Sequence, residues 1–393
     1  MNFKRILSIV MAGLVCAGSV PAQTWSQTSA PRNNWSQIAC SADGSRLVAV
    51  GYPGYIYIST NAGTTWEQTT APGAYWTSVA SSADGSKLIA VSLFQSDPLP
   101  SGIYTSTNWG ETWIAETNAP DLFWTAVASS ADGVKLVATA DFGGLYTSTN
   151  SGDNWTSNAV PDYPWFSVAS SADGTKLLAV AEASGIFIST NSGSVWTQAA
   201  NVPTNYWDSV ASSADGTKLV AVATGAANSP GPVAIYTSPD SGVTWVSNSV
   251  SSQEWLSVAS SADGNKLAAT VPNGPIYTST DSGITWNSNN VPGNYWISIA
   301  SSADGNLLTT VIPDGGIWIS QIIPNPRVKI SASDTSLALS WTICSTNVIL
   351  QYSSDLISWA NMTNSPSLNL ANLNNQVILS STKANGFFRL KTP

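Results

Sequence analysis

The chain has 393 residues, a formal net charge of −9 and no histidine, and only 9% of its residues are charged. This acidic balance makes it a poor ligand for nucleic acid or anionic lipid, because both are bound through clustered Lys and Arg. The absence of histidine excludes Ser-His-Asp hydrolysis and histidine-ligated metal sites.

The first 22 residues are typical of a secretory signal peptide. Lys4 and Arg5 precede an apolar stretch, residues 6–15, and Val20-Pro21-Ala22 forms a small-residue cleavage site. No other apolar run approaches the length of a membrane-spanning helix. We therefore expect cleavage near Ala22 and a secreted protein, either extracellular, periplasmic or at the cell surface, without membrane insertion.

Seven related units fill the chain between Trp35 and Gly305, and each reads close to W-x-S-V-A-S-S-A-D-G-x-K-L-V-A-V. The first Trp of the units recurs every 41 to 48 residues, at Trp35, Trp76, Trp124, Trp165, Trp207, Trp255 and Trp296. Each unit divides into four short apolar runs. They are separated by turn signals such as A-D-G, whose Asp bonds local backbone and whose Gly permits a positive φ. Four strands in about forty residues are the signature of a β-propeller blade.

The two ends of the repeat array complement each other. The seventh unit ends at Gly316–Ser320 without a fourth strand, whereas Thr24–Thr28 reads as a fourth strand with no unit before it. Pairing these segments would close the ring and remove two open sheet edges. The predicted fold is therefore all-β: a seven-bladed β-propeller over residues 23–323, closed by an N-terminal strand.

The repeat stops after Pro324. Residues 324–393 contain short alternating runs such as Leu337–Trp341 and Val348–Tyr352, which predict a small β-sandwich of fibronectin-like type. The string L-S-W…L-Q-Y-S-S-D-L…F-F-R-L resembles C-terminal modules of secreted proteins from verrucomicrobial bacteria. That resemblance implies a role in export or attachment.

A second phrase, close to S-T-[N/D]-x-G-x-T-W, closes the first six units, at residues 59–66, 106–113, 148–155, 189–196, 238–245 and 279–286. It resembles the Asp-box, or BNR repeat, of the propellers in sialidases, sortilin-type receptors and photosystem assembly factors. The resemblance covers residues 24 to about 320 and implies that the box is a folding turn rather than an active site. Four of the six boxes carry Asn at the acidic position, so we expect no metal there.

On a propeller, the A-D-G turns and the boxes share one face, and the remaining loops share the other. Six of the A-D-G turns carry a Lys or Arg two residues after the Gly. The opposite face carries eight carboxylates: Asp97, Asp121, Asp141, Asp162, Glu182, Asp208, Glu254 and Asp314. Two insertions, Val91–Gly102 and Thr224–Ala234, lie on this acidic face, where binding sites of repeat arrays collect. Its aromatic residues differ between units, and we predict that they contact a ligand: Tyr75, Phe94, Phe123, Tyr163, Tyr206 and Tyr295.

Two functions fit this face. The first is non-catalytic binding of a ligand or partner, such as a polysaccharide or a protein. The second is glycoside hydrolysis by two carboxylates about 5–5.5 Å or 6.5–9.5 Å apart, with Asp97, Asp121, Asp141 and Asp162 as candidates. Sialidase chemistry is excluded because it needs an arginine cluster, and the propeller has only Arg32 and Arg46. Neither function calls for a cofactor or metal, and we expect a monomer that does not bind nucleic acid.

Overall fold

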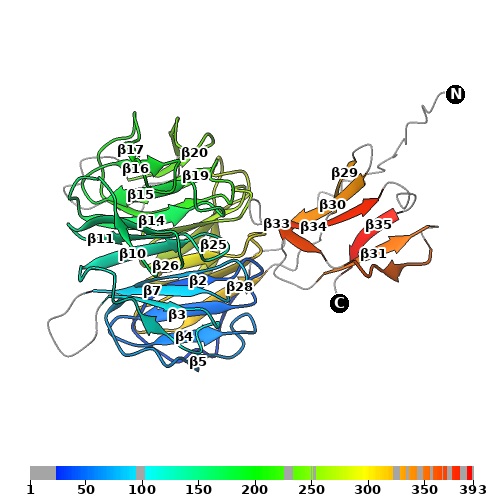
Figure 1. Ribbon diagram of the computed structural model, residues 1–393, viewed down its shortest axis with the longest axis horizontal. Coiled ribbons are helices and arrows are strands. Elements are labelled where there is room, and N and C mark those ends of the chain that lie inside the picture. Colours follow the sequence, from blue (N-terminus) through cyan, green and yellow to red (C-terminus); the bar gives the residue numbers. More distant parts are fainter. Residues whose placement is uncertain are drawn as a thin grey trace.

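The computed structural model describes residues 24–93, 102–224, 233–248, 250, 254–321, 328–332, 336–342, 348–354, 357–364, 366–369, 374–380 and 387–391. Every regular element in these ranges is a β-strand, and no helix long and apolar enough to cross a membrane occurs there. Seven four-stranded sheets form a β-propeller, and two further sheets form the C-terminal part (Figure 1). The predicted signal peptide and the predicted boundary between residues 323 and 324 lie outside the described residues.

The first strand of each blade lines a central channel. These inner strands are β2 (Trp35–Cys40), β6 (Trp76–Ser81), β10 (Trp124–Ser129), β14 (Trp165–Ser170), β18 (Trp207–Ser212), β22 (Ser257–Ser260) and β26 (Ser298–Ser301). The second strands are buried along their whole length: β3 (Leu47–Gly51), β7 (Leu88–Ser92), β11 (Leu136–Ala140), β15 (Leu177–Ala181), β19 (Leu219–Ala223), β23 (Leu267–Thr270) and β27 (Leu307–Val311). Burial on both faces explains why these runs are almost purely apolar.

The third and fourth strands complete each sheet toward its outer edge. The third strands are β4 (Ile56–Ser59), β8 (Gly102–Ser106), β12 (Gly144–Ser148), β16 (Ile186–Ser189), β20 (Ile235–Ser238), β24 (Gly274–Ser279) and β28 (Ile317–Gln321). The fourth strands of blades 1 to 6 are β5 (Glu67–Gln68), β9 (Ile114–Ala115), β13 (Thr156–Ser157), β17 (Thr197–Gln198), β21 (Val246–Asn248) and β25 (Asn287–Asn294). Most of these edges are only two or three residues long, which limits edge-to-edge aggregation.

The ring closes as the sequence predicts. The fourth strand of blade 7 is β1 (Trp25–Gln27), which pairs antiparallel with β28 in the register Trp25↔Ser320, Ser26↔Ile319 and Gln27↔Trp318. The N-terminal strand therefore completes the last blade, and the prediction of seven blades closed by an N-terminal strand is confirmed.

The first Trp of every unit is a packing residue. All seven are at most 1% exposed and most contact an aromatic ring of the third strand edge-to-face, as Trp124 does with Tyr146 at 5.3 Å between ring centroids. Each Trp belongs to an apolar cluster that spans two neighbouring blades: Trp76, for example, packs with Val48 and Ile56 of blade 1. The repeated Trp thus fills the space between blades.

The C-terminal part forms two sheets that fit a small β-sandwich. One sheet has the order β29 (Lys329–Ala332), β30 (Ser336–Thr342), β34 (Asn374–Ser380), β33 (Ser367–Asn369), and the other has the order β32 (Ala360–Asn361), β31 (Ile349–Ser353), β35 (Phe387–Lys391). Leu339 and Trp341 of the first sheet form a buried cluster with Leu350 of the second. A core shared between facing sheets is the defining feature of a sandwich.

Candidate functional site

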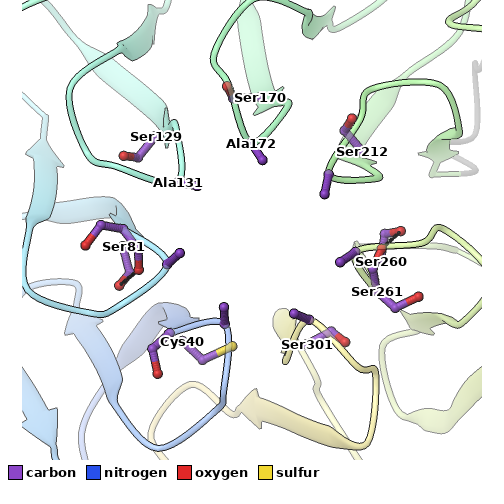
Figure 2. A pocket seen from close by; sticks show the side chains of 17 residues that line it. Cys40, Ser81, Ser129, Ala131, Ser170, Ala172, Ser212, Ser260, Ser261 and Ser301 are labelled. Atoms are coloured by element: carbon purple, nitrogen blue, oxygen red, sulfur yellow. Dashed lines mark hydrogen bonds between the residues drawn. The ribbon is translucent and has the colours of Figure 1, made fainter. Parts of the chain in front are cut away.

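The channel has two ends that differ in chemistry. At the A-D-G end, a cavity of about 170 Å³ is lined by Ser and Ala side chains from every blade, with Cys40 in place of one Ser. Figure 2 shows these side chains around the open centre, with Ala172 pointing into it. Burial, followed by the charges of Asp43 and Asp304, raises the pKa of the Cys40 thiol to about 12, so the thiol stays protonated and unreactive.

A closed ring of hydrogen bonds joins the seven A-D-G turns. The backbone N–H of each Ala donates to the carbonyl of the corresponding Ala in the next blade at 2.7–2.8 Å, through Ala42, Ala83, Ala131, Ala172, Ala214, Ala262, Ala303 and back to Ala42. We call this set the alanine ring. These hydrogen bonds join every blade to both neighbours through backbone atoms alone, so they do not depend on the identity of any side chain.

Each A-D-G turn is also fixed internally. In blade 3, the buried Ser130 hydroxyl donates to Asp132 Oδ1 at 2.6 Å and accepts the backbone N–H of Lys135 at 2.9 Å. Burial of Asp132 acts to raise its pKa, but the hydrogen bonds from Ser130, Val134 and its own backbone N–H, together with the Lys87 charge, outweigh that effect and lower the pKa. The same Ser-to-Asp bond occurs in all seven turns.

The cation of the turn motif connects neighbouring blades. Lys135 Nζ donates to Ser192 Oγ in the box of blade 4 at 3.2 Å, and its stem packs over Gly174 of the next turn, where a Cβ would approach it to 2.7 Å. In blade 1, Arg46 lies over the Trp109 ring of the next box, 5.0 Å from its centroid. These charges are used in holding the ring together, so this end of the channel is scaffold.

The opposite end holds a larger cavity, which we call the channel mouth. Its volume is about 540 Å³ and all seven blades line it. A bulge creates part of the lining. In blades 1 to 5, the register of the inner strand shifts directly after the Trp, which releases the next residue from the ladder. The residue that follows the Trp lines the mouth in every blade: Ser36, Thr77, Thr125, Phe166, Asp208, Leu256 and Ile297.

This position divides the mouth by chemistry. In blades 1 to 3 its hydroxyl bridges to the carbonyl of the next blade's Trp, as in Thr125 Oγ1 to Trp165 O at 2.7 Å. In blades 6 and 7 it is apolar, with Leu256 and Ile297. The residue after the second strand adds Tyr52, Leu93, Asp141 and Glu182 from blades 1 to 4. Three carboxylates thus lie on consecutive blades, 3 to 5.

Among the described carboxyl groups, Asp208 has the pKa that is shifted furthest from its ordinary value. Burial raises its pKa to about 8, the nearby Glu182 charge acts in the same direction, and a hydrogen bond from the Thr224 backbone opposes both. Its Oδ2 atom is enclosed and has no hydrogen-bond partner. Asp208 is therefore mostly protonated at neutral pH, and perturbed carboxyls of this kind in a cavity mark candidate functional sites.

Exposed aromatic rings lie beside Asp141. Phe123 and Phe166 line the mouth, and Phe142 follows Asp141 at the tip of its hairpin with 65% of its surface exposed. The Asp141 N–H bonds to Phe123 O at 2.9 Å and the Phe142 N–H to Tyr163 O at 3.1 Å, which holds this hairpin against blade 4. Phe142 has a φ of 48°, a conformation unusual for a bulky residue.

The structure brings some of the predicted site residues together and separates others. Asp141 and Phe123 line the mouth, whereas Asp121, Asp162, Tyr206 and Tyr295 are not among its described lining residues. Tyr75 contacts Tyr52, a lining residue, at 5.3 Å between ring centroids, and Tyr163 packs on Trp165 and Phe187. Phe94 and Asp97 lie outside the described residues.

Sequence reasoning placed Glu182 and Asp208 on the acidic face but did not select them, and it passed over Tyr52 and Phe166. One available signal was the position after the first Trp, which varies widely within an otherwise constant phrase. Within the described residues, no group of three or more Cys, Asp or Glu stands close enough to hold a metal ion.

Comparison with known proteins gives matches at the level of structure alone, because no family model and no curated protein matches the sequence. A structure described as YCF48 bound to D1 peptide has a TM-score of 0.58 and 17% identity, covering 78% of this chain and 98% of its own. YCF48 from Cyanidioschyzon merolae has a TM-score of 0.59 and 16% identity, and the match covers 76% of this chain and 98% of the YCF48 chain.

A GH74 xyloglucanase from Xanthomonas campestris gives a TM-score of 0.60 and 16% identity over 81% of this chain, but this chain spans only 59% of that longer protein. All three identities are below 25%, so these likenesses concern the fold. The protein is a seven-bladed β-propeller with a small C-terminal pair of β-sheets.

Proposed function

We propose that the protein is a secreted, monomeric, non-catalytic propeller of the Asp-box type that binds a ligand or partner, a protein or a carbohydrate, at the channel mouth. The observation that carries this proposal is the contrast between a constant scaffold and a cavity whose lining changes from blade to blade. A volume of about 540 Å³ lies within the range usual for ligand sites. The peptide-bound YCF48 neighbour supports a protein ligand for a propeller of this shape.

Membership of the Asp-box family is supported by the turn itself. In blade 1, Ser59 Oγ accepts the N–H of Gly63 at 2.9 Å, Asn61 Oδ1 accepts that of Thr65 at 2.8 Å, and the Trp66 indole donates to Gly63 O at 3.2 Å. The donors and acceptors of these three bonds all lie within the turn, which fits a folding role. The C-terminal fibronectin-like module of verrucomicrobial type would serve as a spacer or attachment unit.

A direct test is a binding panel of neutral polysaccharides and peptides, with reducing-sugar release measured in parallel. Phe166→Ala should weaken binding of any ligand of the mouth at least about tenfold, since central anchors dominate interfaces, and Asp141→Asn should weaken binding of any ligand that contacts this carboxylate. Glu111→Gln is the matched control, because Glu111 is an exposed carboxylate in a box at the other end. Ligands whose affinity is untouched by the mouth variants would contradict the proposal.

The second candidate is a glycoside hydrolase, favoured by the pairing of Asp208 with Glu182. A carboxyl with a pKa of about 8 can protonate the glycosidic oxygen as the bond to the anomeric carbon breaks. Glu182 would then take a proton from the attacking water. Reducing-sugar release that falls at least 1,000-fold in both Asp208→Asn and Glu182→Gln would establish this function over binding alone, and binding without release would exclude it.

A further inference from the structure

The channel mouth is acidic on one side and apolar on the other. Asp141, Glu182 and Asp208 come from blades 3 to 5, and Leu256 and Ile297 come from blades 6 and 7. Phe166 of blade 4 also lines the mouth, and its blade lies between the blades that carry Asp141 and Asp208. A ligand that satisfies both sides needs a positively charged end and an apolar body.

The described part of the protein supplies no positively charged side chain to the lining of this site. None of the described lining residues of the mouth is Lys or Arg. Five of the propeller's cationic side chains contact the next blade at the A-D-G end: Arg46, Lys87, Lys135, Lys176 and Lys218. Lys266 bonds Asp304 O in the next turn, and Arg32 donates to Asp314 O at 2.9 Å. None of these cations therefore neutralises Asp141 or Glu182, and these two carboxylates can attract a cation from outside.

The acceptors of the mouth suit a group with several donors. Asp208 Oδ2 is enclosed and unpartnered, which is costly for a polar atom unless a donor arrives. Asp141 and Glu182 lie on separate hairpins that meet at Pro164: Asp141 forms a backbone bridge with Pro164, and the Glu182 N–H donates to Pro164 O at 2.9 Å. Carboxylates spread over three blades match an ammonium with three N–H donors or a guanidinium with five.

Resting on the ligand-binding function above, we propose that the channel mouth takes a Lys or Arg side chain of a protein partner. Its charged end lies among Asp141, Glu182 and Asp208, and its aliphatic stem and neighbouring apolar residues lie on Phe166, Leu256 and Ile297. Long cationic side chains combine these two needs, because an apolar stem carries the charge.

The test uses the full mature chain and three blocked pentapeptides, acetyl-Gly-Leu-X-Leu-Gly-amide, with X as lysine, ε-acetyl-lysine or arginine. Calorimetry at low salt and pH 7 should show that acetylation weakens binding at least tenfold. Glu182→Gln and Asp141→Asn should each weaken binding of the charged peptides about fivefold or more and leave the acetylated peptide unaffected. The control Glu111→Gln should change neither affinity.

A second readout follows the proton on Asp208. Glu182 and the Thr224 N–H are the groups that act on this carboxyl, and Asp141 lines the same cavity. A bound cation should lower the pKa of Asp208 and release a proton at pH 7, so the binding heat should differ between phosphate and Tris buffers. Asp208→Asn should abolish that difference even if it changes the affinity little.

The outcomes separate the inference from the proposed function. Equal affinity for the lysine and acetyl-lysine peptides, or charged-peptide binding that ignores all three carboxylate variants, would overturn the inference. A neutral hexasaccharide that binds and loses affinity in Phe166→Ala, with the charged peptides inactive, would retain ligand binding and overturn the cationic partner. No binding by any probe would overturn both.

Discussion

The two ends of one channel are built from the same seven strands, yet they obey different rules. At the A-D-G end, every blade contributes the same Ala, Ser and Asp, and hydrogen bonds within and between turns use nearly every polar group. At the mouth, the residue that follows the first Trp changes from hydroxyl to aromatic, carboxyl and aliphatic around the ring. Repetition therefore marks what holds the propeller together, and variation marks where it can bind.

The largest expected difference between constant and variable positions concerns aromatic side chains. Trp124 is fully buried between blades, so Trp124→Ala should lower the free energy of unfolding by about 3–5 kcal/mol. Phe166→Ala at the mouth removes a ring that is 47% exposed and should cost about 1 kcal/mol or less. Urea unfolding followed by circular dichroism measures both, and similar costs for the two would break the comparison.

Asp208 should lower the free energy of unfolding as the pH rises. Its pKa is about 8 in the folded protein and near 3.8 in the unfolded chain, so its contribution to stability is complete below pH 3.8 and is lost as pH rises toward 8. Relative to Asp208→Asn, the wild type should lose up to about 3 kcal/mol between pH 5 and pH 7. Unfolding of both proteins across this range tests the sign. A constant difference between them would show that the carboxyl titrates normally.

Buried hydroxyls at the constant end should matter more than those at the mouth. Ser130 is 1% exposed and connects Asp132 to the backbone of Lys135, so Ser130→Ala should cost about 1–3 kcal/mol. Thr125→Val removes a partly buried bridge to Trp165 O and should cost about 1 kcal/mol. A larger loss from the Thr125 change would mean that the mouth, too, holds the ring closed.

The turn cations should give the smallest effect. Lys135→Met keeps the stem over Gly174 and removes the 3.2 Å bond to Ser192 together with the attraction between the charge and Asp173, so stability should fall by less than about 1 kcal/mol. The loss should be smaller still in 1 M salt. A loss above 2 kcal/mol would show that the charge, rather than the stem, joins the blades.

The fold was readable from the sequence because its determinants are local and repeated. The A-D-G turn, the Trp and the unmatched strand at Trp25 each carry their own structural signal, and the pairing of Trp25 with Ser320 followed from counting strands. Four strands per blade and seven blades therefore needed no knowledge of side-chain positions.

The site was only partly readable. Asp141 and Phe123 were selected from their loops, but Asp121 and Asp162 share that face without lining the cavity. Asp208 stands inside a strand phrase, and its environment depends on Glu182 of a neighbouring blade and on enclosure by the ring. Neither the bulge that exposes the position after the Trp nor the convergence of three blades is encoded within one repeat.

The alanine ring has a consequence for how such a protein can change over generations. Its seven bonds run between backbone atoms of corresponding Ala residues, so the same bond joins every pair of neighbouring blades. A blade could be duplicated, exchanged or moved to the other end of the gene, and the newcomer would still find matching partners on both sides. Residues of the channel mouth could then change without loss of these bonds, because the alanine ring lies at the A-D-G end.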